Sequence, residues 1–136
     1  MDFLKSIMVA ASGLKAQTGR MRVIAENLAN ADSLGRTEGA QPYRRRIPVM
    51  QASFDRTLES QIVKVGRPIE DKSEFGLRHM PGHPAANENG YVQTPNVNAL
   101  IETMDMRAAQ RSYEANLNVI TAARRMMQRT IDILRV

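Results

Sequence analysis

Proline is confined to the middle of this 136-residue chain. All six prolines lie between Pro42 and Pro95, and the segments on either side contain none. Proline lacks a backbone N–H and clashes with the preceding helical turn, so a long helix can run only outside that stretch. The sequence therefore predicts one long helix at each end, over residues 1–32 and 97–136, around a middle insert of strands and loops at 33–96.

The N-terminal segment carries small and apolar residues at alternating steps of three and four, which is the spacing of a heptad repeat. Gly13 and Gly19 interrupt this stripe, and each lowers helix propensity by about 1 kcal/mol relative to alanine. A helix with these glycines is only marginally stable alone, so it needs a packing partner. The stripe residues predicted to lie in an assembly interface are Leu4, Ile7, Ala11, Leu14, Met21 and Leu28.

The C-terminal segment shows the same repeat without any glycine or proline. Its apolar row recurs every seven residues from Met106 to Leu134, and Ala109 and Ala123 occupy flanking positions. A helix of roughly 35 residues would be about 50 Å long. The residues of this segment predicted to lie in the assembly interface are Met106, Tyr113, Leu117, Ile120, Met127, Ile131 and Leu134.

These two stripes predict a mainly α fold in which the terminal helices pair as an antiparallel coiled coil and form one discontinuous domain. The insert is expected to be β-rich, with strands at 47–50, 61–65 and 74–79 and a loop at 80–89. A two-helix hairpin cannot bury all of this apolar surface, which favours packing against similar hairpins. A single hairpin that closes over the insert within a monomer is the alternative.

Composition and motifs favour no enzymatic chemistry. Cysteine is absent, which excludes disulfides, thiolate metal sites and a cysteine nucleophile. His79 and His83 are the only histidines, and they lie in a proline- and glycine-containing loop without a third ligand nearby in sequence. No nucleophile elbow or phosphate-binding glycine loop occurs. We therefore predict no catalytic residue, no cofactor and no metal site.

The net charge of +5 raises the question of an acidic partner. The densest basic cluster is Arg44, Arg45 and Arg46, which Pro42 and Pro48 bracket, so it cannot form a continuous basic helix that enters DNA. Aromatic residues make up only 4% of the chain, too few to stack on single-stranded bases. We expect these three arginines to contact acidic groups on a protein partner, and we expect neither nucleic-acid binding nor direct insertion into a membrane.

Several segments resemble the bacterial flagellar axial proteins. Near the N-terminus, ASGL at residues 11–14 is followed by RVIAENLANAD at 22–32. Further along the chain, the matching segments are PYRRR at 42–46, PGHPAANENGYV at 81–92, PNVN at 95–98 and RSYEANLNVITAAR at 111–124. The resemblance covers nearly the whole chain, and its last two segments are similar to the rod proteins of the basal body in particular.

This resemblance implies a non-enzymatic subunit of the proximal rod, the periplasmic drive shaft that transmits torque from the motor. It implies self-assembly and assembly with other rod proteins, and export through the flagellar type III apparatus without a cleaved signal peptide. A small coiled-coil adaptor and a nucleic-acid-binding helical hairpin are the alternative functions that the residue patterns leave open.

Overall fold

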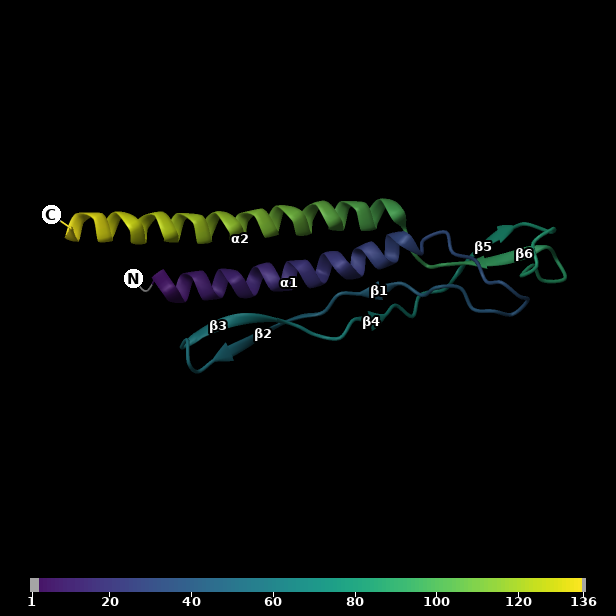
Figure 1. The fold of residues 1–136 in the computed structure, drawn as a ribbon. Helices are drawn as coiled ribbons and strands as arrows, with labels where there is room; N and C mark the ends of the chain where they lie inside the picture. The colour runs from purple at the N-terminus through teal and green to yellow at the C-terminus, as the bar shows by residue number, and fades with distance from the viewer. Residues whose placement is uncertain (1–2, 136) are drawn as a thin grey trace. The chain divides into compact units, whose positions relative to one another are not determined.

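A computed structural model describes residues 3–135 of the chain. Helix α1 spans Phe3–Ala29 and helix α2 spans Ala99–Leu134, and all the strands lie between them (Figure 1). The predicted arrangement of one helix at each end around a small β-rich middle is confirmed. No helix within residues 3–135 is both long and apolar enough to cross a membrane.

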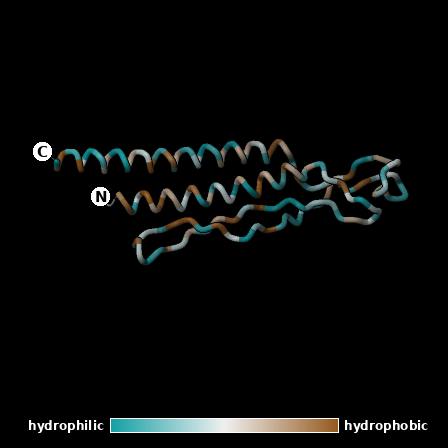
Figure 2. Tube along the Cα trace, in the orientation of Figure 1, coloured by the Kyte–Doolittle hydropathy of each residue, from teal (hydrophilic) through white to brown (hydrophobic). Residues whose placement is uncertain are grey.

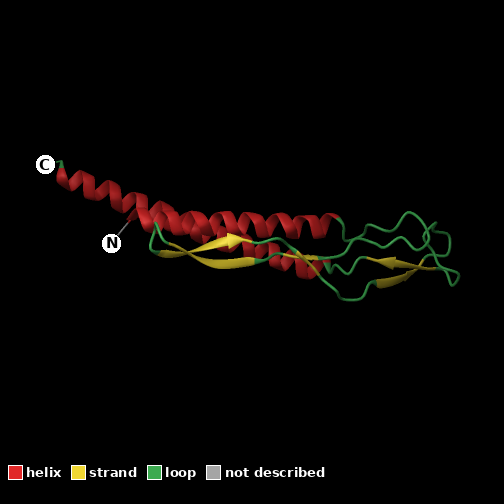
Figure 3. Cartoon of the chain, turned by 90° about the horizontal axis from the view of Figure 1, so that it is seen from below, coloured by secondary structure: helices red, strands yellow, loops and turns green. Residues whose placement is uncertain are grey.

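Three separate antiparallel strand pairs make up the β structure, shown as yellow arrows in Figure 3. Strand β1 (Arg46–Ile47) pairs with β4 (Ile69–Glu70), β2 (Met50–Asp55) with β3 (Ser60–Val65), and β5 (Gly76–His79) with β6 (Tyr91–Thr94).

The predicted strand at 47–50 is wrong. Residues Pro48 and Val49 separate the end of β1 from the start of β2. Proline cannot donate a hydrogen bond to a neighbouring strand, which ends the pairing at this point.

The ends of both helices have local polar causes. Helix α1 stops at Ala29, three residues before the predicted boundary, and the Asn30 side chain donates to the Glu26 carbonyl oxygen at 2.8 Å. Asn98 begins α2, because its Oδ1 accepts hydrogen bonds from the amides of Leu100 and Ile101.

Contacts divide the chain into two compact units. Unit 1 comprises Met1–Met21, Val49–Arg67 and Arg107–Val136, and unit 2 comprises Arg22–Pro48 and Pro68–Met106. Each unit therefore contains part of both helices and at least one strand pair. The predicted boundaries at 33 and 97 group the helices differently, and that division stays a prediction.

In unit 1, two glycines of α1 permit close approach of other elements. A Cβ atom at Gly13 would lie 2.8 Å from Asn116 Oδ1 of α2, and one at Gly19 would lie 3.0 Å from Val65 Cγ1 of β3. Ser12 Oγ also accepts a hydrogen bond from the Val63 amide at 3.2 Å. The glycines that weaken α1 as an isolated helix thus make room for its neighbours in this unit.

Candidate assembly site

The predicted interface residues of α1 are mostly left accessible within the chain. Leu4 is 62% exposed and Ala11 is also exposed, whereas Ile7, Leu14, Met21 and Leu28 are half-buried. The fully buried positions of this helix lie beside the predicted stripe, at Ala10, Ala16, Val23, Ile24 and Asn27.

In α2 the most buried row follows the heptad spacing at Glu102, Ala109 and Ala123. The predicted row is half-buried at Met106, Tyr113, Ile120 and Met127. Leu117, Ile131 and Leu134 are exposed, with Leu134 at 80%. Half of the predicted stripe is therefore covered by the chain itself, and the role of the remainder in assembly stays a prediction.

A second apolar stripe, which the sequence reasoning did not include, runs along the exposed side of α2 in unit 1. Val119, Met126 and Ile133 are 48%, 45% and 74% exposed, and they recur every seven residues. Ala115 and Ala122, which are also exposed, fill the positions between them. Their spacing of four, three and four residues would have revealed this stripe as a second heptad row.

Unit 2 is built on a buried polar pair. Asn27 and Glu102 are 0% and 1% exposed, and Asn27 Nδ2 donates to Glu102 Oε2 at 3.1 Å. Because a buried carboxylate is costly unless it is paired, its other partners are decisive. Arg45 Nε donates to Glu102 Oε1 at 2.6 Å, which supplies the countercharge.

The Asn27 side chain also holds the chain at Arg46. Its Nδ2 donates to the Arg46 carbonyl oxygen at 2.8 Å, and its Oδ1 accepts from the Arg46 amide at 2.9 Å. The Tyr43 hydroxyl donates to the same Oδ1 at 2.9 Å. Burial raises the pKa of Tyr43 above its ordinary value, which keeps this hydroxyl protonated as a donor.

Asn96 and Asp71 extend the network on the other side of Arg45. The Arg45 amide donates to Asn96 Oδ1 at 2.7 Å, and Asn96 Nδ2 donates to the Asp71 carbonyl oxygen at 3.1 Å. The Arg45 guanidinium lies 3.5 Å from Asp71 Oδ2. Burial opposes the charge of Arg45, but its contacts with Glu102 and Asp71 outweigh that effect and raise its pKa.

The three clustered arginines therefore all have partners within their own unit. Arg44 donates to the carbonyl oxygens of Asp71 and Ser73 and lies over the Phe75 ring at 4.2 Å. Arg46 pairs with Glu26 at 3.3 Å, and its side chain remains 47% exposed. The predicted contact of this cluster with another protein stays a prediction.

The network residues Asn27, Asp71, Asn96 and Glu102 were not selected from sequence. Asn27 and Asn96 lie inside the NLANA and PNVN motifs, which mark them as notable without revealing their contacts. Glu102 continues the heptad row of Ala109 and Ala123, and a charged residue in such a row was the available signal.

The two histidines take part in local contacts of the β5–β6 loop. The His79 ring lies 5.0 Å from the Tyr91 ring, and His83 Nδ1 accepts a hydrogen bond from the Ala85 amide. Among residues 3–135, no group of three or more His, Asp and Glu side chains is placed to hold a metal ion.

We expect Asp71 to make the stability of the protein fall in acid. A hydrogen bond from the Ser73 amide, at 2.9 Å, and the nearby Arg45 lower the pKa of Asp71. A lowered pKa stabilises the fold above the unfolded-state value of about 3.9, and this contribution is lost as pH falls through the folded-state value. Urea unfolding between about pH 6 and pH 3 should show a weaker acid dependence for Asp71→Asn than for the wild type. Equal acid dependence of the two proteins would contradict this account.

Two family models of flagellar rod proteins match the chain. One, described as flagella basal body rod protein, matches residues 7–35, and the other, described as flagellar basal body rod FlgEFG protein C-terminal, matches residues 88–133. These ranges contain most of α1 and α2.

Full-length relatives agree with these matches. The chain is 46% identical over 127 residues to the flagellar basal-body rod protein FlgC of Agrobacterium fabrum, covering 93% of this chain and 91% of the relative. It is 39% identical to the proteins of the same name from Bacillus subtilis and Salmonella typhimurium, each over 98% of this chain and 99% and 98% of the relatives. The chain belongs to the FlgC family of structural proteins of the flagellar basal-body rod.

Proposed function

We propose that this structural, non-enzymatic rod subunit works by packing its terminal helices against neighbouring subunits in a helical or tubular array that transmits torque. The exposed apolar stripe on α2 is the observation that carries this proposal. Monomeric proteins seldom leave a regular heptad row open to water. Burying it yields about 25 cal/mol per Å² of apolar surface, and the gain is repeated at every identical contact.

The two close contacts between helices support antiparallel pairing. Gly13 approaches Asn116 in unit 1, and Asn27 bonds to Glu102 in unit 2. The contact residue moves 14 positions forward on α1 as it moves 14 positions backward on α2. Opposite directions identify an antiparallel pair, and 14 residues are two heptads, the repeat that a coiled coil requires.

The predicted interface residues that remain exposed extend the available surface. Leu4 and Ala11 of α1 and Leu117, Ile131 and Leu134 of α2 are accessible for contacts with other subunits. We infer that they pack together with the Val119, Met126 and Ile133 stripe. Arg46, with its half-exposed side chain, is the member of the arginine cluster best placed to reach a neighbour.

We place the subunit in the proximal, periplasmic part of the rod, where it assembles with itself and other rod proteins. We propose that it reaches the periplasm through the flagellar type III apparatus without a cleaved signal peptide. Neither nucleic-acid binding nor membrane insertion forms part of this function. Relatives in three organisms that carry the same rod-protein name support the assembly partners proposed here.

Cell fractionation tests the proposed function directly. In a strain whose only copy carries a C-terminal epitope tag, the protein should purify with detergent-resistant basal bodies, and deletion of the gene should abolish motility. The tagged strain must first be shown to swim. Recovery with the nucleoid would favour a nucleic-acid-binding hairpin, and recovery only in cytoplasmic complexes would favour an adaptor.

A further inference from the structure

Positive charge is concentrated in one of the two compact units. Unit 1 has twelve Lys and Arg against five Asp and Glu, a net charge of +7, whereas unit 2 has seven against nine, a net charge of −2. The net charge of +5 for the whole chain therefore conceals a strongly basic unit and a weakly acidic one.

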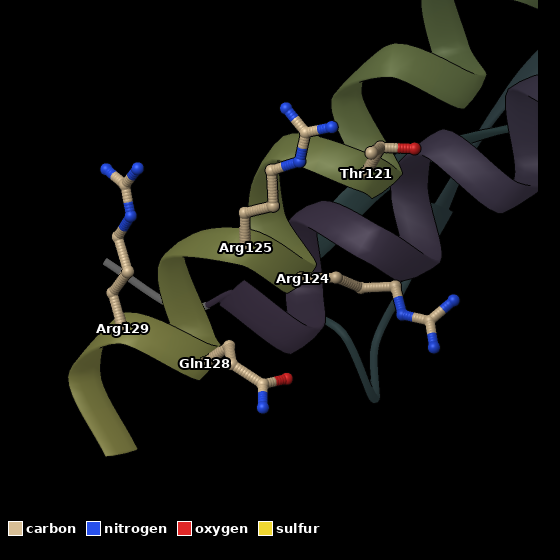
Figure 4. Close-up of a pocket in the computed structure, with 5 residues that line it drawn as sticks. All are labelled: Thr121, Arg124, Arg125, Gln128 and Arg129. Carbon is tan, nitrogen blue, oxygen red and sulfur yellow. The ribbon is translucent and has the colours of Figure 1, made fainter. Parts of the chain in front are cut away.

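The arginines of α2 in unit 1 differ from those of unit 2 in their partners. Arg45, Arg46 and Arg78 of unit 2 each lie within 4.0 Å of a carboxylate. By contrast, Arg124, Arg125 and Arg129 have no ion-pair partner among residues 3–135. Figure 4 shows their three guanidinium groups extending away from α2 and from one another, around a shallow hollow that Thr121 and Gln128 also line.

These arginines border the exposed apolar stripe. We define the arginine edge as the outer side of α2 that carries Arg107, Arg111, Arg125 and Arg129. The second pair lies 18 residues, or five helical turns, beyond the first, so all four fall on one side of the helix. Val119, Met126 and Ile133 lie next to this edge on the exposed surface. An apolar row flanked by charge is the arrangement through which coiled coils select their partners.

The sign of the flanking charge restricts what can cover the stripe. A second copy of α2 would bring its own arginine edge against this one, and like charges across an interface are unfavourable. Unit 2 of a second copy supplies a net charge of only −2 against +7. A helix with glutamate or aspartate beside an apolar row would neutralise the edge and bury the stripe together.

We propose that the arginine edge of α2 binds an acidic amphipathic helix that belongs to a different protein. This inference rests on the proposed function, since it names the chemistry of one neighbour in the assembly. Guanidinium groups one helical turn apart on Arg125 and Arg129 match carboxylates spaced one turn apart on that partner.

Binding of a synthetic probe to the purified full-length protein tests the proposal. The probe is a fluorescent amphipathic helical peptide whose apolar row is flanked by glutamates, and its control has glutamine at each of those positions. Fluorescence anisotropy should show tighter binding of the glutamate peptide, and the difference should shrink as salt is added. The triple variant Arg124→Gln, Arg125→Gln, Arg129→Gln should bind the glutamate peptide about tenfold more weakly, since each exposed ion pair contributes modestly.

A charge-matched variant separates the edge from general attraction. Arg56, Lys64 and Arg67 lie in or beside the β2–β3 hairpin of unit 1 and are exposed, so changing all three to glutamine removes the same charge elsewhere. This control should bind the peptide as the wild type does, apart from a small shared electrostatic loss. Equal weakening in both variants would overturn the proposal.

Alternative ligands provide the remaining decisive outcomes. Tighter binding of the wild type to duplex DNA or to phosphatidylglycerol vesicles than to the peptide, lost in the edge variant, would assign the edge to those ligands instead. Dimerisation of the wild type that the edge variant abolishes would assign it to a second copy. These results are independent of whether the protein fractionates with basal bodies, so failure here and failure of the proposed function can be told apart.

Discussion

Replacing Glu102 by alanine is expected to lower the free energy of unfolding by about 3 kcal/mol or more, because it removes one partner of a buried ion pair. Glu102 is 1% exposed and accepts hydrogen bonds from both Arg45 and Asn27. Without the carboxylate, the Arg45 guanidinium loses its closest countercharge and the Asn27 amide loses an acceptor. Urea unfolding followed by circular dichroism at neutral pH would measure the loss.

Two further variants make this expectation specific. Glu114→Ala removes an exposed carboxylate from the same helix and should change stability by less than about 0.5 kcal/mol. Glu102→Gln keeps an acceptor of similar shape but removes the charge, so its loss should lie between the other two. If Glu102→Ala unfolded at the wild-type urea concentration, the buried pair would not organise unit 2 as described.

The second large effect is expected in assembly and not in folding. Changing both Val119 and Met126 to aspartate places two carboxylates on the exposed stripe of α2, where water solvates them in the free subunit. In an assembled rod the same carboxylates would be desolvated without partners, at a cost of several kcal/mol per contact. Motility should be lost while the thermal unfolding of the purified subunit remains close to that of the wild type.

A matched variant with the same charge change controls for electrostatics. Gln110→Asp together with Asn118→Asp adds two carboxylates to exposed positions of α2 outside the apolar stripe. Cells with this variant should still swim in soft agar. If they stopped swimming while the Val119 and Met126 variant swam normally, the stripe would not be the surface through which the subunit assembles.

The regular elements were predictable because strong local rules specify them. The absence of proline at both ends gave two helices, and Asn98 starts α2 within two residues of the predicted boundary. The strand at 47–50 failed because apolar character alone suggested it, while Pro48 lacks the amide needed for pairing.

The buried face of α1 was misplaced for a different reason. The predicted stripe selected large residues such as Leu4, but the deepest contacts use Ala10, Ala16 and the glycines, whose small size lets other elements approach. A periodicity argument finds an apolar face without deciding which edge of it packs most closely.

The polar network of unit 2 could not be predicted from local pattern. Its members Asn27, Arg45, Asp71, Asn96 and Glu102 are spread over 76 positions of sequence, and no spacing rule connects them. Only the fold brings them together. Their motifs marked some of these positions as notable, but they could not show that Arg45 would be neutralised inside its own chain.

The paired hydrogen bonds between Asn27 and Arg46 have a consequence for local opening. One side-chain amide holds both the N–H and the C=O of a single residue, as a neighbouring strand would. Removing Arg46 from this site breaks both bonds in one event and leaves the amide of a fully buried asparagine without those partners. The Arg46 amide proton should therefore exchange with solvent at a rate set by the opening of unit 2, and not by the fraying typical of a two-residue strand.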